Sequence, residues 1–256
     1  MIDIMANAVK SAAQALRQGS RQPFVKSGGF EFSCGADISA HAAAESTLKA
    51  AAPHVRLISE ENADRDFNAA RAFILDPLDG TSNFIAGIPF YAVSLAYAEY
   101  GEVKHAAVLC PNTGELFTAT AGAGAYLNGV RISVPRSGRP ESFLAGIGTQ
   151  PYLRANPAQK FRLMQAAFEK FSDVRRLGAA ALELCFVACG RLGVFAEQGL
   201  KGWDYSAAML IVREAGGVVT DFEGRQTRAA AEGDIASAGP EIHSALLGFI
   251  KEVKFD

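Results

Sequence analysis

The chain is poor in the residues from which disulfide frameworks and zinc sites are built. It contains four cysteines and four histidines in 256 residues. The cysteines form no Cys-x-x-Cys pair, and the histidines are scattered without the spacing of metal ligands. Cys185 and Cys189 are spaced to lie on one face of a helix. We therefore expect small buried thiols, and neither a structural zinc site nor a disulfide framework.

Long apolar runs and an excess of one charge are missing as well. No apolar run approaches the length of about 20 residues that spans a bilayer, and the first residues lack the pattern of a secretory signal peptide. A net charge of −2 gives no reason to expect broad binding to nucleic acid or to an anionic membrane. With 49% hydrophobic and 20% charged residues, the composition is typical of a globular protein, which we expect in the cytoplasm.

The patterns along the chain differ between residues 1–135 and residues 136–256, which we expect to form two closely packed parts. The pattern of the first part predicts helices and short strands, followed by an antiparallel meander with a hairpin turn at Asn128-Gly129. The second part alternates strands with helices. The expected helices cover residues 4–17, 38–51, 157–171, 178–190, 203–215 and a last segment from 240; the expected strands cover 55–58, 73–76, 91–98, 103–109, 115–120, 125–127, 130–132, 143–147, 174–177, 194–196 and 218–222; and a polar loop is expected over 20–29.

The most informative stretch runs from Phe73 to Phe84. It begins as a short apolar strand, which we expect Pro77 to end because proline removes a backbone donor. Asp79-Gly80-Thr81 then predicts a turn that opens a helix. Asp76 and Asp79 would converge at the end of a buried strand, where negative charge is costly unless cations share the site. The alternative for Asp79 is an ordinary turn residue.

The whole stretch Asp-Pro-Leu-Asp-Gly-Thr-x-Asn-Phe resembles the central motif of the inositol monophosphatase family. Two further motifs agree with that family in type and order: Ser59-Glu60-Glu61 upstream, and Trp203-Asp204 downstream with Glu214-Ala-Gly-Gly after it. The resemblance covers nearly the whole chain. It implies an α+β fold, a layered α-β-α-β-α sandwich of the fructose-1,6-bisphosphatase/inositol monophosphatase type. It also implies a homodimer and inhibition by lithium.

The resemblance implies a Mg²⁺ site with two or three ions. Glu60, Asp76 and the carbonyl of Leu78 would hold one ion; Asp76, Asp79 and Asp204 would hold a second; and a third, weaker ion would lie beside Glu60. Oxygen donors without histidine or cysteine are the type that Mg²⁺ prefers. The alternative for Asp204 is an acid in the first turn of a helix, where it interacts with the helix dipole.

The same resemblance assigns the catalytic and phosphate-binding groups. Thr81, hydrogen-bonded to Asp37, would act with Glu60 to orient and deprotonate the attacking water. The amides of Gly80 and Thr81 would bind phosphate oxygens, together with Leu78 and Asp79. The alternative for Asp37 is the N-cap of the helix expected over 38–51.

The leaving alcohol is expected between Asp204 and the second part of the chain. The resemblance implies that the backbone of Gly178, Ala179 and Ala180 contacts substrate hydroxyls and that Glu197 accepts a hydrogen bond from them. The alternative for the Gly178–Ala181 segment is close helix packing.

The function implied is a Mg²⁺-dependent phosphomonoesterase acting on inositol monophosphate or a similar small polyol or sugar phosphate. Related enzymes hydrolyse histidinol phosphate, fructose 1,6-bisphosphate or 3′(2′),5′-bisphosphate nucleotides, and the metal motifs do not choose among these substrates. A different class of function is also open, because some bacterial relatives bind the transcription machinery. The intact acidic set favours retained catalysis without excluding that second role.

Overall fold

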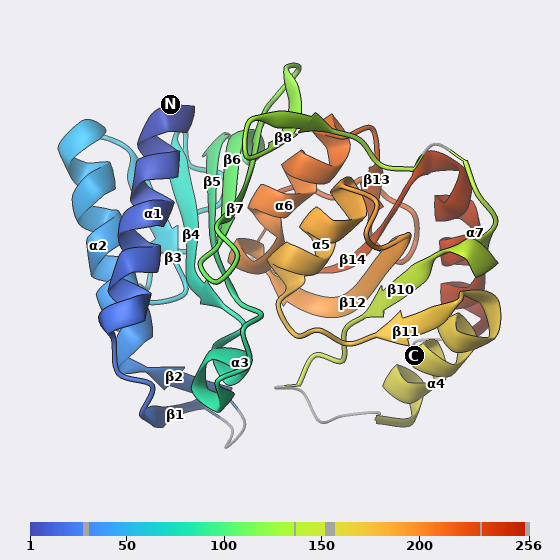
Figure 1. Cartoon of the computed structure of the whole chain (residues 1–256). Helices are drawn as coiled ribbons and strands as arrows, with labels where there is room; N and C mark the ends of the chain where they lie inside the picture. The colour runs from blue at the N-terminus through green and yellow to red at the C-terminus, as the bar shows by residue number, and fades with distance from the viewer. Residues whose placement is uncertain (28–30, 136, 152–156, 231, 254–256) are drawn as a thin grey trace.

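The helices and strands form five layers in which helices and sheets alternate (Figure 1). The computed structural model describes residues 1–27, 31–135, 137–151, 157–230 and 232–253. Two helices cover one face of a seven-stranded sheet, two central helices lie between it and a five-stranded sheet, and two more cover the far face of the second sheet. This order of layers confirms the predicted α+β fold, the α-β-α-β-α sandwich.

The first two layers come from the N-terminal half of the chain. Helices α1 (Ile2–Gln18) and α2 (Gly35–Ala51) pack on the sheet, and α1 buries a stripe of apolar residues at helical spacing. In spatial order, the strands of the sheet are β3 (Arg56–Ser59), β4 (Ala72–Asp79), β5 (Ala92–Glu99), β6 (Glu102–Cys110), β7 (Glu115–Thr120), β8 (Gly124–Leu127) and β9 (Val130–Ile132).

Within this sheet, β3 and β4 are parallel and the following pairs are antiparallel. The short helix α3 (Thr81–Ala86) follows β4 directly. The turn between β8 and β9 has positive φ at both Asn128 (49°) and Gly129 (80°), the backbone of a two-residue hairpin turn. The predicted meander and its hairpin are confirmed.

The remaining layers come from the C-terminal half. The central helices are α5 (Ala180–Ala188) and α6 (Gly202–Glu214), and the outer helices are α4 (Pro157–Lys170) and α7 (Pro240–Val253). A 3₁₀ turn, η1, covers Pro140–Ser142. In spatial order, the strands of the second sheet are β11 (Asp173–Arg175), β10 (Leu144–Ile147), β12 (Val194–Lys201), β14 (Glu232–Ala238) and β13 (Val218–Thr220).

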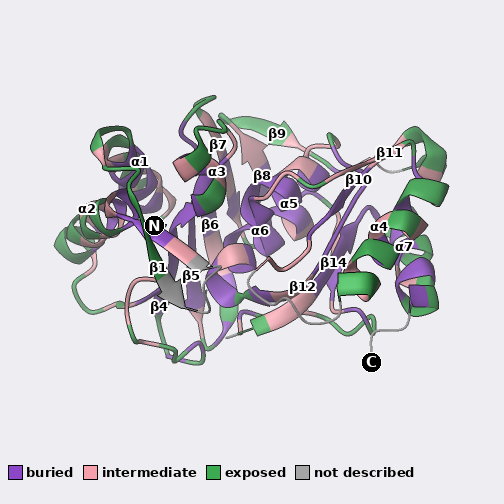
Figure 2. Cartoon of the chain, turned by 90° about the horizontal axis from the view of Figure 1, so that it is seen from below, coloured by how far each residue is buried: buried purple, intermediate pink, exposed green. Residues whose placement is uncertain are grey.

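Apolar cores fill the spaces between the layers. The largest joins the first sheet to the central helices, and α6 buries ten of its 13 residues. Figure 2 shows α5 and α6 buried in the middle of the molecule, while the outer helices keep exposed faces. Polar side chains at the starts of α5 and α6 therefore lie inside the protein, where their charges are poorly solvated.

Strand β4 does not end at Pro77, so that prediction was wrong. The strand continues to Asp79, and its pairing with β5 shifts register between Asp76 and Asp79. Pro77 lies in this irregular stretch, where the regular ladder is interrupted and its missing N–H removes no ladder bond. The bulge keeps both aspartates in one strand.

Two regions contain strands that the sequence did not predict. Where a polar loop was expected, β1 (Pro23–Ser27) pairs antiparallel with β2 (Glu31–Cys34); residues 28 and 29 of the expected loop lie outside the described residues. Strand β14 lies between β12 and β13. It is made largely of small and acidic residues, so it has little apolar alternation to reveal it.

The cysteines agree with the expectation of small buried thiols. All four are free thiols, three of them buried and Cys189 partly buried. Within the described ranges, no helix combines the length and the apolarity that a membrane crossing requires.

Candidate active site

Two parallel strands bring the first carboxylates to one edge of the sheet. The pairing of β3 with β4 ends at Ser59 and Leu75, so Glu60, in the turn after β3, and Asp76, in β4, come next at the same end of the two strands. Asp76 is buried, and its Oδ1 accepts a hydrogen bond from the N–H of Leu78 at 2.9 Å. Burial first, and then the charge of Glu60, raise the pKa of Asp76 well above its usual value.

Asp79, the last residue of β4, lies against the start of α5. Its Oδ1 accepts the N–H of Ala180 at 3.2 Å and its Oδ2 the N–H of Ala181 at 2.8 Å. Burial raises the pKa of Asp79 to about 7, although these two amides favour its ionised form. The carboxylate therefore occupies the amide-rich end of a helix from the other half of the chain.

Asp204 comes from α6, where it is the third residue of the helix. Its Oδ2 accepts the N–H of Lys201 at 2.8 Å, which fixes the side chain at the helix start. Desolvation in the cavity wall and the charge of Asp79 raise the pKa of Asp204 well above its usual value. The alternative reading of Asp204 as a first-turn acid thus describes its position correctly and does not exclude a ligand role.

These carboxylates surround a single cavity with a volume of about 120 Å³. Most of the residues predicted for the site line it, and they come from both halves of the chain. The cavity is lined by Glu60, Asp76, Leu78, Asp79, Gly80, Thr81, Ser82, Pro151, Arg176, Gly178, Ala180, Glu197, Leu200, Lys201, Trp203 and Asp204.

Thr81 and Asp37 approach each other at the limit of hydrogen bonding. The Thr81 hydroxyl is 3.5 Å from Asp37 Oδ1 and donates more closely, at 3.0 Å, to the carbonyl of Leu78. The other Asp37 oxygen accepts from the Ser33 hydroxyl (3.0 Å) and from the N–H and thiol of Cys34 (2.7 and 3.2 Å). Burial nevertheless raises the pKa of Asp37.

The alternative role of Asp37 as an N-cap is wrong. The helix begins at Gly35, three residues earlier than predicted, so Cys34 occupies the N-cap. Asp37 is the third helical residue and reaches back to the Cys34 N–H. This leaves its Oδ1 directed toward Thr81.

The segment expected to contact the leaving group is tightly fitted. Gly178 has φ +86°, and a Cβ there would come within 2.3 Å of Arg176 Nη1. A Cβ on Gly80 would lie 3.2 Å from the Ala179 side chain. Gly178 and Ala180 line the cavity, whereas Ala179 is buried and packs beside Gly80. The close packing expected of this segment is therefore confirmed, and Gly178 and Ala180 also form part of the cavity wall.

Glu197 lies inside β12, where the irregular pairing with β14 begins, whereas the expected strand stopped at residue 196. Its Oε1 accepts the N–H of Gln150 at 2.8 Å, and the side chain is buried. Burial raises the pKa of Glu197, while the Gln150 amide and the charge of Arg176 oppose that shift.

Glu183 is a buried carboxyl that the sequence analysis missed. Its oxygens accept the N–H groups of Leu177 (3.4 Å) and Gly178 (3.0 Å), the segment that forms the cavity wall. Burial, with the charge of Glu197 added, raises the pKa of Glu183 to about 8. One acidic residue inside the otherwise apolar run of α5 was the available signal.

Two cationic residues of the cavity were missed too. Arg176 and Lys201 both line it, and each has an exposed side chain. Arg176 Nε donates to the Thr149 hydroxyl at 3.3 Å, and Lys201 pairs with Glu232 at 2.5 Å. No sequence pattern marks them, since neither belongs to an acidic or glycine-rich motif.

The carboxylates have the chemistry of a site for hard divalent cations. The pKa values of Asp76, Asp79 and Asp204 are all raised because burial and mutual repulsion oppose ionisation, and cations among them would offset both effects. Over the described part of the chain, no three His, Cys, Asp or Glu side chains converge closely enough to form a ready metal centre. Asp79 and Asp204 are turned toward backbone amides. The oxygen donors of these carboxylates are of the type that Mg²⁺ binds.

Comparison with known proteins shows similarity over the whole length. The family model described as "Inositol monophosphatase family" matches residues 1–254. The chain is 37% identical to the Nus factor SuhB of Vibrio cholerae, over 98% of this chain and 96% of that protein. It is 35% identical to an inositol-1-monophosphatase of Rhizobium meliloti, over 88% and 86%. The structure of an IMPase from Thermotoga maritima superposes with a TM-score of 0.89 at 28% identity, over 98% and 96%.

Proposed function

The chain belongs to the inositol monophosphatase family, and we propose that it is a Mg²⁺-dependent phosphomonoesterase that hydrolyses inositol monophosphate or a similar small polyol or sugar phosphate. One observation supports this most: four carboxylates from three separate segments, Glu60, Asp76 with Asp79, and Asp204, line one cavity. Hard oxygen donors without nitrogen or sulfur ligands suit Mg²⁺. A similar bacterial protein is named inositol-1-monophosphatase.

In this proposal the cavity holds two or three Mg²⁺ ions. The ligands are Glu60, Asp76, the carbonyl of Leu78, Asp79 and Asp204. When bound, Mg²⁺ neutralises the phosphate, stabilises charge on the leaving oxygen and lowers the pKa of a bound water. Inhibition by lithium at one of the cation positions is part of the same proposal.

Thr81 orients the attacking water in the proposed reaction. Its hydroxyl proton is directed to Leu78 or Asp37, so its oxygen lone pairs are free to accept a hydrogen bond from water. Glu60 lies on the same cavity and accepts the proton that the water loses. The water then attacks phosphorus directly, and the alcohol leaves with a proton from solvent or a neighbouring water.

The phosphate and the alcohol occupy opposite sides of the cavity. The Gly80 and Thr81 amides bind phosphate oxygens at the turn after β4, beside Leu78 and Asp79. Substrate hydroxyls contact Asp204, Glu197 and the backbone from Gly178 to Ala180. Ala179 contributes through its backbone, because its side chain packs beside Gly80.

The substrate is tested by a phosphate-release screen with Mg²⁺. Inositol and sugar monophosphates, histidinol phosphate, fructose 1,6-bisphosphate and 3′(2′),5′-bisphosphate nucleotides are compared at equal concentration. We expect the highest kcat/KM with a polyol or sugar monophosphate. A preference of tenfold or more for one of the other esters would replace the proposed substrate class and leave the chemistry in place.

A second function has one observation in its favour. A relative of 37% identity that matches 98% of this chain is named a Nus factor, so we propose that this chain also binds the transcription machinery. A pull-down from cell extract with the Asp204→Asn variant separates the two functions. Recovery of transcription proteins by this inactive variant supports a regulatory role, and their absence with both variant and wild type opposes it.

A further inference from the structure

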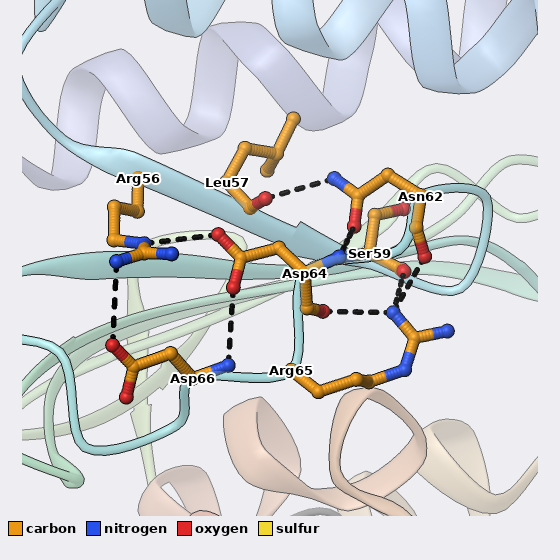
Figure 3. Close-up of polar contacts among 7 residues, drawn as sticks. All are labelled: Arg56, Leu57, Ser59, Asn62, Asp64, Arg65 and Asp66. Carbon is orange, nitrogen blue, oxygen red and sulfur yellow. Dashed lines mark hydrogen bonds and ion pairs between the residues drawn. The ribbon is translucent and has the colours of Figure 1, made fainter.

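The connection between β3 and β4 begins with a turn held by polar contacts (Figure 3). Glu60 is the first residue after β3 and lines the cavity. Asn62 closes this turn: its Nδ2 donates to the carbonyl of Leu57 at 2.8 Å, and its Oδ1 accepts the N–H groups of Ser59 (3.2 Å) and Asp64 (3.1 Å). A backbone held from both sides of Glu60 has a defined conformation, so the direction of that side chain depends on these contacts.

Arg65 binds the same turn from its other end. Its Nη1 donates to the carbonyls of Ser59 (3.1 Å), Asn62 (2.6 Å) and Asp64 (2.8 Å). Figure 3 shows the three carbonyl oxygens converging on one end of the guanidinium. Two of these carbonyls flank Glu60 in sequence, and hydrogen bonds from a charged donor are stronger than neutral ones. Arg65 therefore fixes the backbone on both sides of Glu60.

The same guanidinium lies on the ring of Trp203. The Arg65 Cζ is 4.5 Å from the ring centroid, within the range of a cation–π contact. Phe67, two residues along, stacks with that ring at a centroid distance of 6.5 Å and an interplanar angle of 26°. Trp203 is the second residue of α6 and immediately precedes Asp204.

Gly202 shows how closely the start of α6 fits this connection. A Cβ at Gly202 would come within 2.3 Å of the Phe67 ring and within 2.0 Å of the Ala230 carbonyl oxygen. The Phe67 ring therefore packs directly against the start of α6, while the Ala230 carbonyl packs against the same residue. The turn that carries Glu60 and the helix that carries Asp204 are thus in direct contact, although about 140 residues separate them in sequence.

We propose that Arg65 is a positioning residue that holds Glu60 and Asp204 at a fixed separation across the cavity. It does so by binding the carbonyls around Glu60 and by lying on the ring next to Asp204. The inference rests on the proposed function, since its consequence is a preformed pair of cation ligands. Side chains that orient metal ligands without touching the ion affect affinity strongly.

Arg65 in this connection and Arg56 in β3 make a matched pair for the test. Arg65→Gln removes the cation, the carbonyl bonds and the ring contact together. Arg56→Gln is the control: Arg56 pairs with Asp64 (2.9 Å) and Asp66 (3.3 Å) in the same connection and belongs to neither the turn around Glu60 nor the ring contact. Arg65→Lys keeps a cation over the ring, but a compact ammonium lacks the planar fork of arginine.

The first measurement is the emission of Trp203, the only tryptophan in the chain. In metal-free buffer we expect Arg65→Gln to shift the emission to longer wavelength, because the ring loses its cover, and we expect Arg56→Gln to match the wild type. The second measurement is Mn²⁺ binding, followed through the electron paramagnetic resonance of the free ion. We expect Arg65→Gln to weaken Mn²⁺ binding about 10-fold, Arg65→Lys to recover part of the loss, and Arg56→Gln to stay within about twofold of the wild type.

The proposal is overturned if Arg65→Gln leaves the emission unchanged, because the ring contact is then not made in solution. It is also overturned if the emission shifts while Mn²⁺ affinity equals that of the Arg56→Gln control. Circular dichroism and thermal unfolding check that each variant is folded, and Arg65→Lys replaces Arg65→Gln in the comparison if the latter is not. A wild type that binds no Mn²⁺ and hydrolyses no ester contradicts the proposed function itself. If only the Arg65 proposal fails, the wild type binds Mn²⁺ and Arg65→Gln binds it equally well.

Discussion

The carboxylate of Asp79 accepts a hydrogen bond from the N–H of Ala181 at 2.8 Å. Asp79 ends a strand of the first sheet, whereas Ala181 lies in the first turn of the central helix α5. One side chain therefore joins the two halves of the chain at the cavity, and the pKa of about 7 reflects its burial there. In the proposed function the same carboxylate also holds a cation, so it links metal binding to the wall that receives the alcohol.

We expect Asp79→Asn to weaken Mg²⁺ activation and lower kcat/KM by about 10-fold or more, since even the loss of a group that only orients a metal ligand has an effect of that size. The amide nitrogen of asparagine would also face an α5 N–H, which should cost about 1–3 kcal/mol of stability. A Mg²⁺ titration of phosphate release and a thermal melt measure the two effects. Asp173→Asn, on the partly exposed β11, is the control. An Asp79→Asn protein with normal Mg²⁺ dependence would remove Asp79 from the ligand set.

We expect Thr81→Ala to lower turnover by about 10²–10⁴-fold while leaving the Mg²⁺ dependence intact. The hydroxyl positions water in the proposal, and no metal carboxylate is changed. Asp37→Asn should lower turnover in the same way, and the double variant should be little worse than either single variant, because residues that act as one unit are not additive. Turnover numbers of the four proteins decide this.

The 3.5 Å separation of Thr81 and Asp37 makes the outcome of that cycle informative. If the two losses multiply, the residues act independently, and the nearer Leu78 carbonyl is the partner of Thr81. Thr81→Ser keeps the hydroxyl and serves as the control. Near-normal turnover of Thr81→Ala would contradict the role of Thr81 altogether.

Glu183 should make the metal-free protein less stable as pH rises. Its pKa is raised from 4.5 to about 8 in the folded state, so the folded protein retains a proton that the unfolded chain releases. The contribution of Glu183 to the free energy of unfolding is therefore fully present below about pH 4.5 and is lost as the pH rises to about 8. The loss is at most about 1.4 kcal/mol per pH unit. Glu183→Gln cannot ionise, so the melting temperature of wild type relative to this variant should fall across that range.

Thermal unfolding in chelator at pH values from about 5 to 9 measures this difference. Glu169→Gln, on the exposed face of α4, is the matched control and should follow the wild type. A difference in melting temperature between wild type and Glu183→Gln that is the same at all pH values would show that Glu183 does not titrate in this window.

We expect the protein to be a homodimer in solution, as the resemblance to its family implies. Light scattering at micromolar concentration should give twice the chain mass of 27.1 kDa. A mass equal to one chain under these conditions would remove the prediction.

The sequence predicted the parts of the site that depend on local motifs. Asp76, Asp79 and Thr81 lie in one continuous stretch, and Glu60 follows the adjacent parallel strand, so their meeting at one cavity follows from topology. The bulge at Pro77 was not predictable, because it is defined by the register of β5. The alternative that Asp37 is the N-cap of its helix was wrong for a similar reason. The start of that helix depends on Cys34 and its contacts.

Residues that act through tertiary contacts gave little signal. Glu183 and Arg65 contact backbone groups whose positions depend on the fold, and Arg176 enters the cavity only because β11 ends beside it. Strand β14 was missed because its pairing with β12 and β13, and not an apolar pattern, makes it a strand. Local sequence patterns thus predict the motifs of the site, and they do not reveal the side chains that hold those motifs together.

In the proposed function the carboxylate cavity hydrolyses phosphate esters only when it holds divalent cations. The most direct measurement is phosphate release from the best substrate of the screen, by purified protein stripped with EDTA and then titrated with Mg²⁺. We expect no release above background after stripping and full recovery with Mg²⁺, while Asp76→Asn stays inactive at the Mg²⁺ concentration that restores the wild type. Full activity in thoroughly chelated buffer would show that the reaction does not depend on divalent cations.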